Sequence, residues 1–220
     1  MKWRSPCSLI ISLTIITIGS LSVYAQSQRY PTNVEIQKII REFQQRASSP
    51  PLERECCGGT ERDTRTTAQR QPLESFVKAW SQAAPTVAPF LGWWVNNDGE
   101  IGVYPSNVRG RVCVIQASPL PNYRFSVGSI SSGKISLSGD LAGRVLLNQR
   151  NSIGNTFLLV ASVGSDNIAR ASPGSDIYTY PELPQAPTKL PLSKASPQEN
   201  SRIVREFNAA GCTVSLPKQR

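Results

Sequence analysis

Four cysteines are the residues of this chain whose chemistry is most easily named. The sequence has 220 residues and five cysteines, and only Cys7 lies in the apolar N-terminal segment. The even number that remains predicts two disulfides formed in an oxidising compartment; these residues are Cys56, Cys57, Cys113 and Cys212. A bond between the neighbours Cys56 and Cys57 would close a strained ring. We therefore expect one of them to pair with Cys113 and the other with Cys212.

The chain contains no histidine. This absence excludes Ser-His-Asp and Cys-His catalysis and every zinc site that needs imidazole. A metal site made of cysteines alone usually has Cys-x-x-Cys pairs, which this sequence lacks. Catalysis would have to use carboxylates or a Ser-Lys pair. We therefore predict a non-enzymatic protein with no catalytic residue, no metal site and no cofactor; the alternative is a histidine-free hydrolase.

One Gly- and Ser-rich stretch, residues 128–134, matches two short motifs in part. It matches most of the sequence pattern of a phosphate-binding loop. Position 135, however, is Ile instead of Ser or Thr, and the residues after it alternate like a strand. It also contains Ser131 and Lys134 in a Ser-x-x-Lys spacing that resembles penicillin-binding proteins, with Ser165-Asp166-Asn167 further on. The Lys-Thr-Gly motif of that family is absent, and the serine lies at a turn. Both matches favour a hairpin turn over a catalytic or nucleotide-binding loop.

Acidic residues offer the remaining route to hydrolysis. Two carboxylates can share the acid and base roles if the fold brings them together. The acids of the middle of the chain lie at or beside turn-forming residues, where they are usually solvated; they are Asp98, Glu100, Asp140, Asp166 and Asp176. Their spacing selects no pair as catalytic.

Aromatic residues supply the binding hypothesis. Trp93, Trp94 and Tyr104 stand close together at the start of a β-rich region. Packing in the core is one interpretation of these residues, and a cavity or platform for an apolar molecule is the other. We predict that these three side chains bind an apolar ligand.

The β-rich region extends from about residue 90 to about residue 180. Asn96-Asn97-Asp98-Gly99 is a strong hairpin signal between two apolar runs. Further short runs follow at a spacing of about 8–12 residues, with turn residues between them and no helical pattern, which is typical of an antiparallel barrel or sandwich. The expected strands are 93–95, 101–104, 111–115, 123–127, 134–137, 143–147, 156–163 and 177–180.

Gly92-Trp93-Trp94 places a Gly-x-Trp motif after a short helical lead-in and before the serial strands. With a late helix after the strands, this order of elements resembles a lipocalin. The resemblance covers the order of elements and this one motif, and no ligand residues are carried over from it.

Amphipathic helices are expected on both sides of the strands. Thr32 and Glu35 form a capping box at the start of a helix over 32–46. A second helix is predicted from Pro72 to about residue 84, and a third over 197–210, which Gly211 ends. The segments 39–44 and 203–208 are similar in sequence, either by chance or because both helices pack on the same β core.

The expected organisation is a signal peptide (1–25), an N-terminal helix (26–47), a flexible Cys-containing loop (48–71) and a β-rich globular domain (72–216). Residues 181–197 contain five prolines and predict an extended strap. Residues 212–216 could add an edge strand.

The first 25 residues predict export. Lys2 and Arg4 precede an apolar run, and Val23-Tyr24-Ala25 offers a cleavage site. The apolar run is too short and too rich in Ser and Thr to favour a permanent membrane span, and no span is expected once the signal is cleaved. A retained N-terminal anchor is the alternative. We expect a periplasmic, cell-envelope or secreted protein.

The net charge of the chain indicates which binding partners to expect. The net charge is +9, and residues 189–220 hold six basic and two acidic residues. A basic tail suits an anionic envelope component, although charge can also serve solubility alone. Binding to nucleic acid is not expected, because no dense basic run or aromatic-basic motif is present. We therefore expect an exported protein that binds an apolar small molecule or an anionic surface, with a protein–protein interaction module as a further alternative.

The mature protein is predicted to contain no free thiol. Alkylation of the unreduced, denatured protein, followed by measurement of its intact mass, should show no added groups. One added group or more would contradict the prediction of two disulfides.

Overall fold

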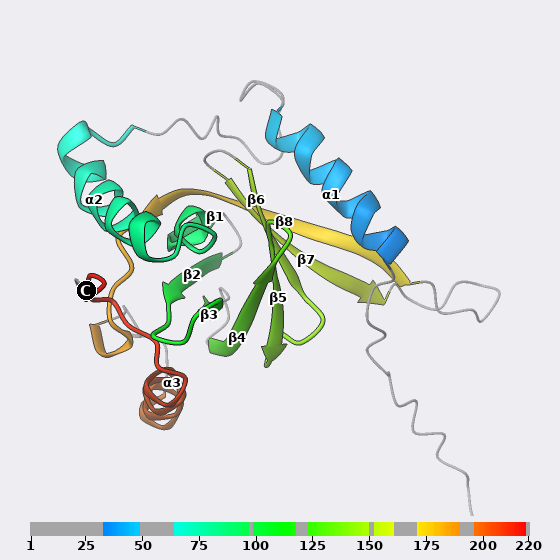
Figure 1. Ribbon diagram of the computed structural model, residues 1–220. Helices are drawn as coiled ribbons and strands as arrows, with labels where there is room; N and C mark the ends of the chain where they lie inside the picture. The colour runs from blue at the N-terminus through cyan, green and yellow to red at the C-terminus, as the bar shows by residue number, and fades with distance from the viewer. Residues whose placement is uncertain are drawn as a thin grey trace, which may run out of the picture.

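The computed structural model describes residues 33–48, 64–96, 99–117, 123–149, 152–160, 171–189 and 196–218. Eight antiparallel strands pair in chain order, and the last pairs back with the first to close a barrel (Figure 1). The mainly β fold with helices at both ends is therefore confirmed. The strands are β1 (Gly92–Asn96), β2 (Gly99–Pro105), β3 (Arg111–Ala117), β4 (Tyr123–Ser131), β5 (Lys134–Gly139), β6 (Val145–Gln149), β7 (Ser152–Val160) and β8 (Ala171–Glu182).

Alternating side chains divide the strands into an inner and an outer apolar face. On β2 and β3, Val103 and Val112 belong to the inner cluster, whereas Tyr104 and Cys113 belong to the outer one. All four are completely buried. These two strands are therefore apolar on both faces, since both faces are covered.

The barrel interior is filled where β3, β4 and β5 meet. Gly128 of β4 lies opposite Val112 of β3 and Leu137 of β5. A Cβ atom on Gly128 would lie 2.3 Å from Ile135 and 2.8 Å from Val112. Glycine is needed here because neighbouring side chains occupy the space, and this part of the interior is solid core.

Helix α2 (Thr67–Ala83) and the short helix η2 (Ala88–Phe90) close one end of the barrel. Phe76 and Trp80 of α2 join the inner cluster together with Trp94. The predicted start of this helix at Pro72 is wrong, because a capping box between Thr66 and Gln69 starts it five residues earlier.

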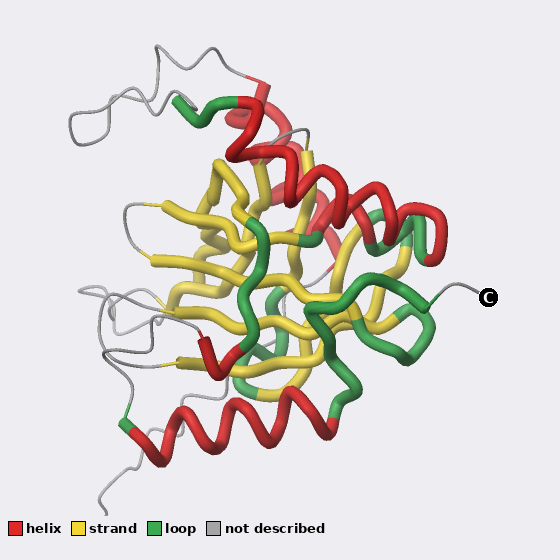
Figure 2. Tube along the Cα trace, turned by 90° about the vertical axis from the view of Figure 1, so that its left-hand side faces the viewer, coloured by secondary structure: helices red, strands yellow, loops and turns green. Residues whose placement is uncertain are grey.

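Helices α1 (Asn33–Ser48) and α3 (Pro197–Ala209) pack on the outside of the barrel. Figure 2 shows α3 on one side of the strands and the other α-helices on the opposite side. Ile39 and Phe43 of α1 contact Val145 and Leu147 of β6. A Cβ atom on Gly154 would lie 2.7 Å from the Phe43 ring, so a glycine on β7 lets α1 approach.

The equivalent residues of α3, Ile203 and Phe207, pack on the outer face of β2, β3 and β4. The similar segments 39–44 and 203–208 thus both dock on the barrel wall, on different strands. As predicted, α3 begins after the cap Ser196 and ends before Gly211, whose φ of +70° favours glycine.

Two expectations about the C-terminal half need correction. Residues 212–216 form no strand; only the single bridge between Ser106 and Cys212 is present. The chain turns away towards α2, where the Trp80 Nε1 donates a hydrogen bond to the carbonyl oxygen of Ser215 at 3.2 Å. The expected strap over 181–197 starts within β8 and contains the helical turn η3 (Pro187–Lys189).

Replacing Phe207 with alanine should lower the free energy of unfolding by about 3–5 kcal/mol, because a buried ring is removed from the α3 contact. Thermal and urea denaturation of Phe207→Ala would measure this. Asn208→Ala, at the exposed neighbouring position of the same helix, is the control and should change little. Equal stability of the two variants would show that α3 is not docked in solution.

Candidate functional site

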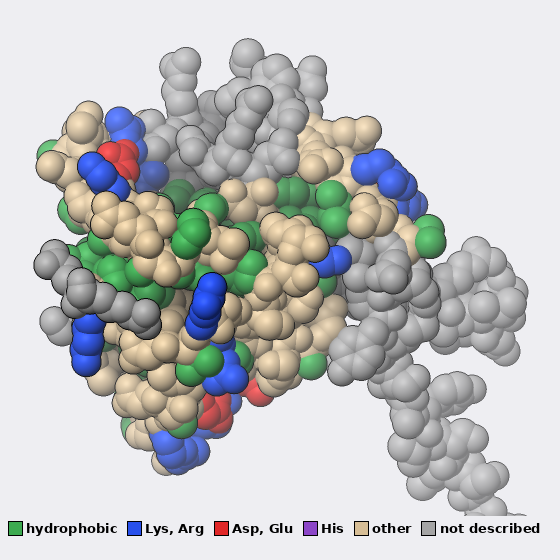
Figure 3. All heavy atoms as spheres, in the orientation of Figure 1, with side chains coloured by type: hydrophobic (Ala, Val, Ile, Leu, Met, Phe, Trp, Pro, Cys, Tyr) green, Lys and Arg blue, Asp and Glu red, His purple; other side chains and the backbone are tan. Residues whose placement is uncertain are grey.

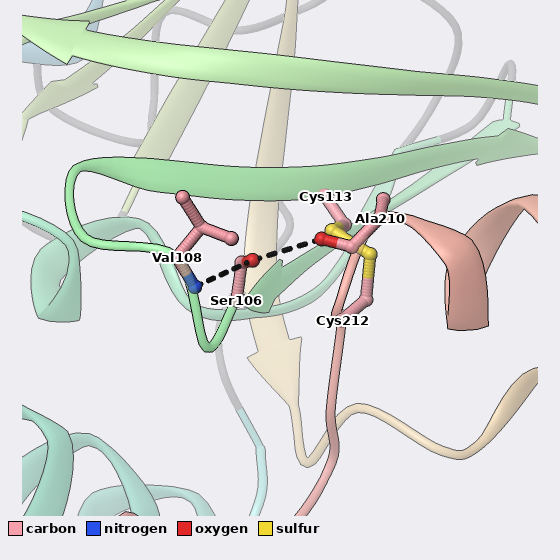
Figure 4. Close-up of a disulfide and its surroundings, with 5 residues drawn as sticks. All are labelled: Ser106, Val108, Cys113, Ala210 and Cys212. Atoms are coloured by element: carbon pink, nitrogen blue, oxygen red, sulfur yellow. Dashed lines mark hydrogen bonds between the residues drawn. A yellow bond between two sulfur atoms is a disulfide. The ribbon is translucent and has the colours of Figure 1, made fainter.

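The disulfide joins Cys113 of β3 to Cys212, just after α3 (Figure 4). The predicted pairing of Cys113 and Cys212 with Cys56 and Cys57 is therefore wrong. Docking of α3 returns the chain to β3 and brings the two Cα atoms, 99 residues apart in sequence, to 6.0 Å, a distance suited to a disulfide. Cys56 and Cys57 lie outside the described residues.

Hydrogen bonds join the same two segments around the disulfide. The Ser106 hydroxyl donates to the carbonyl oxygen of Ala210 at 3.0 Å and accepts from the backbone N–H of Val108 at 3.1 Å (Figure 4). The backbone N–H of Asn107 donates to the carbonyl oxygen of Gly211 at 2.8 Å. The β2–β3 turn and the C-terminal segment therefore form one fixed unit.

The three predicted ligand residues lie on two faces of the sheet. Trp93 and Tyr104 belong to the outer cluster under α3, and Trp94 belongs to the inner cluster. Trp93 donates from Nε1 to Glu100 Oε2 at 2.7 Å, and Trp94 donates from Nε1 to the carbonyl oxygen of Phe90 at 2.8 Å. In the described residues their contacts are those of core packing, and a ligand-binding role for them stays a prediction.

Tyr104 is the centre of the outer cluster. Its ring makes edge-to-face contacts with Trp93 and Phe207, at centroid distances of 6.4 and 5.0 Å. Its hydroxyl donates to the carbonyl oxygen of Gln185 at 3.1 Å. Burial raises the pKa of Tyr104 far above its usual value, so the folded protein keeps this phenol neutral.

A chain of polar side chains lies inside the other end of the barrel. Gln116 shares the inner face of β3 with Val112 and Val114, and its Nε2 donates to the Tyr178 hydroxyl at 3.3 Å. Its Oε1 accepts from Arg144 Nη1 at 3.4 Å. Because neighbouring strands are antiparallel, odd-numbered strands start at the α2 end of the barrel and even-numbered strands start at the opposite end. Gln116 is near the end of β3, and Arg144 comes just before β6. Both residues therefore lie at the end opposite α2. We call this end the mouth, defined by Gln116, Leu141 and Arg144; the hydroxyl of Tyr178 reaches it from β8.

Leu141 fills part of the mouth from the turn between β5 and β6. Its side chain is 1% exposed and belongs to the inner cluster, and its backbone N–H donates to the Ser126 hydroxyl at 2.8 Å. Gly139 and Gly143, with φ of +84° and +82°, lie on either side of it and allow the sharp bends of this turn. The turn is thus built to hold one apolar side chain inside the barrel.

The polar chain of Gln116, Arg144 and Tyr178 was not among the features predicted from the sequence. The signal was present in β3, where Gln116 interrupts the inward series of Val112 and Val114. It could not be interpreted because the residues of β3 that face outwards are apolar too, so the inner face was not known.

The stretch 128–134 is a hairpin, as the sequence favoured. Ser131 and Lys134 face each other across the turn that ends β4 and starts β5. Ser132 and Gly133 form that turn with positive φ values of 51° and 72°. A Ser-Lys nucleophile needs a sheltered lysine beside the serine, and Ser131 is exposed.

Three described carboxylates around α3 make structural contacts. Asp140 and Glu206 both accept from Arg202 Nη1, at 3.1 Å for the nearest oxygen of each. Burial alone would lower the pKa of Arg202. Its hydrogen bond to Asp140 and the charge of Glu206 outweigh this effect, so the pKa of Arg202 is raised above its usual value. Glu199 accepts from the backbone N–H of Tyr123 at 2.7 Å. Asp140 thus links the β5–β6 turn to α3, Glu199 links α3 to β4, and the Arg202–Glu206 pair lies within α3.

Among the described residues, no group of three or more Cys, Asp or Glu side chains is arranged to hold a metal ion. None of the described helices is both long and apolar enough to cross a membrane. Compared with protein-family models, curated proteins and solved structures, the chain gives no match. Its function must be argued from its own residues.

Stability should fall as the pH rises above about 10, the usual pKa of tyrosine. The unfolded chain loses the Tyr104 proton there, whereas the folded protein keeps it because its pKa is raised, so alkali favours the unfolded state. Each such proton contributes a slope of about 1.4 kcal/mol per pH unit.

Urea denaturation between pH 8 and 11 would test this dependence. Tyr104→Phe should be less stable at pH 8 but lose stability less steeply above pH 10. Part of the loss of stability with pH should persist in Tyr104→Phe, because the pKa of Tyr123 is raised too, mainly by burial and also by the charges of Glu100 and Glu199. An unchanged slope in Tyr104→Phe would contradict this assignment.

Proposed function

We propose that this protein is an exported, non-enzymatic binding protein that holds a small apolar molecule at the mouth of its barrel. The observation that carries the proposal is the polar chain of Arg144, Gln116 and Tyr178, which lies among mainly apolar side chains in the described part of the barrel interior. Tyr178 is only 2% exposed. Ligand sites are mostly apolar surfaces with a few convergent polar groups that fix the orientation of the ligand.

The size of the barrel supports a small ligand. An eight-stranded barrel is just wide enough to be filled by its own side chains or to hold one small molecule. Around Gly128 the interior is filled, because Val112 and Ile135 occupy the space that a side chain would need. A ligand therefore has to enter at the mouth, where it has to displace the apolar side chain of Leu141.

The turn that carries Leu141 suits such an exchange. The backbone N–H of Leu141 donates to the Ser126 hydroxyl and its carbonyl oxygen accepts from the N–H of Arg144, and two glycines with positive φ flank it. An apolar ligand that displaced Leu141 would keep the interior dry, and its polar end would meet Gln116 and Tyr178. The exchange replaces one apolar contact with another, so its net cost is small.

Location is the second part of the proposal. The Cys113–Cys212 disulfide is consistent with an oxidising compartment, which supports the export predicted from residues 1–25. The hydrolase alternative gains no such support, because the described acids at the mouth end of the barrel are bound to Arg202, to a backbone N–H group or, for Glu100, to the Trp93 indole.

Native mass spectrometry of the protein, purified without detergent from its own host, tests the proposal. A discrete extra mass that is lost on denaturation is the expected result. Gln116→Leu should reduce the bound fraction about tenfold, since the polar end of the ligand would lose a hydrogen-bond partner. Ser136→Ala, on the exposed face of β5, is the control and should keep the wild-type fraction.

A bare protein mass in the wild type, together with no uptake of an added apolar fluorescent probe, would contradict a ligand at the mouth. Equal loss of ligand in Gln116→Leu and Ser136→Ala would place the ligand elsewhere.

A further inference from the structure

Two exposed aliphatic side chains lie on the unit that the disulfide holds together. Large hydrophobic side chains are strongly exposed at three described positions, which are Val34, Val108 and Leu216. Val108 lies in the β2–β3 turn and is 45% exposed, and Leu216 lies in the C-terminal segment and is 62% exposed. The disulfide and the hydrogen bonds of Ser106 and Asn107 tie the β2–β3 turn to residues 210–212, and the bond from Trp80 to the carbonyl oxygen of Ser215 holds the chain beside Leu216.

The same two segments carry cations and no acids. Arg109, Arg111 and Lys218 are exposed, and neither 105–113 nor 211–218 contains Asp or Glu. In the view of Figure 3, blue Lys and Arg side chains are scattered over the face, whereas red carboxylates are confined to the upper left and the bottom. We call the unit of Val108, Arg109, Arg111, Leu216 and Lys218 the hairpin–tail surface.

We propose that the hairpin–tail surface docks the protein on an anionic lipid surface. Aliphatic side chains enter the boundary between head groups and acyl chains, and neighbouring Lys and Arg side chains bind the anionic head groups. The hairpin–tail surface presents both kinds of side chain from two segments that are held rigidly. Less conformational entropy is lost on docking when the contacting segments are already ordered.

The combination of side chains favours lipid over an acidic glycan. A glycan would contact the three cations but would gain nothing from Val108 and Leu216. The position of the surface also fits, because the β2–β3 turn lies at the α2 end of the barrel and the mouth lies at the other end. Docking would therefore leave the mouth accessible, and it does not depend on whether the mouth holds a ligand.

Co-sedimentation of the oxidised mature protein with vesicles tests the proposal. The protein should bind vesicles of equal parts phosphatidylglycerol and phosphatidylcholine, and should bind pure phosphatidylcholine at least about tenfold more weakly. The double variant Arg109→Gln/Arg111→Gln should weaken binding to the anionic vesicles about 20-fold. Lys38→Gln/Arg41→Gln removes the same charge from exposed positions of α1 and should have less than about a twofold effect.

The aliphatic side chains need their own pair of variants. Val108→Ser/Leu216→Ser leaves the charge unchanged and should weaken binding about tenfold. Val34→Ser, at the exposed aliphatic position of α1, is the matched control and should bind like the wild type. Circular dichroism and melting temperature would establish that each variant is folded.

Each other outcome would overturn the proposal. Equal binding to neutral and anionic vesicles, or no binding to either, would exclude an anionic lipid surface. Equal losses of vesicle binding in Arg109→Gln/Arg111→Gln and Lys38→Gln/Arg41→Gln would mean that net charge alone attracts the protein to the vesicles. Loss in Arg109→Gln/Arg111→Gln without loss in Val108→Ser/Leu216→Ser would indicate an acidic polymer such as a glycan instead of lipid.

Discussion

The packing of α3 on the outer face of β2, β3 and β4 is the contact on which both proposed surfaces depend. Ile203 and Phe207 bury the apolar stripe of the helix against Tyr104 and its neighbours. At one end of α3, Gly211 and Cys212 attach the C-terminal segment to the β2–β3 turn. Towards the other end, Arg202 binds Asp140 in the turn that carries Leu141. One helix thus positions the hairpin–tail surface and also braces the mouth.

The contributions to this contact differ in size. Burying the Phe207 ring stabilises the docked helix by a few kcal/mol, and the disulfide adds about 2–4 kcal/mol by restricting the unfolded chain. The ion pairs of Arg202 are partly exposed and contribute at most about 1 kcal/mol each. Apolar packing therefore holds α3 in place, and Arg202 orients the β5–β6 turn more than it stabilises the fold.

The two proposed surfaces lie at opposite ends of one barrel, so the two proposed roles do not compete for the same residues. The α2 end is closed by Trp80, Trp94 and η2, so no exchange of ligand is expected there. The mouth combines a buried polar chain with a turn in which Gly139 and Gly143 have positive φ. A protein that rests on lipid through its closed end would present its mouth to the aqueous side, where an apolar molecule could be taken up or released.

Local sequence determined most of the elements, because their signals act over a few residues. The hairpin at residues 96–99, α1 and α3 were predicted from turn residues, periodicity and caps. The later strands were predicted too, although β7 and β8 begin four and six residues before the expected positions 156 and 177. The start of α2 is encoded by the capping box of Thr66 and Gln69, a local signal that competes with Pro72, which also favours a helix start. The similarity of 39–44 to 203–208 also indicated two docked helices, although the strands beneath them could not be named.

Tertiary structure alone decided the disulfide partner and the inward or outward direction of each aromatic residue. Cys113 meets Cys212 because α3 folds back over β3, across 99 residues, and no local pattern encodes that return. Trp93 and Trp94 had to face opposite ways, but both faces of the first strands are apolar, so alternation could not identify the interior. The polar chain at the mouth depends on closure of the barrel, since only closure brings Tyr178 of β8 to Gln116 of β3.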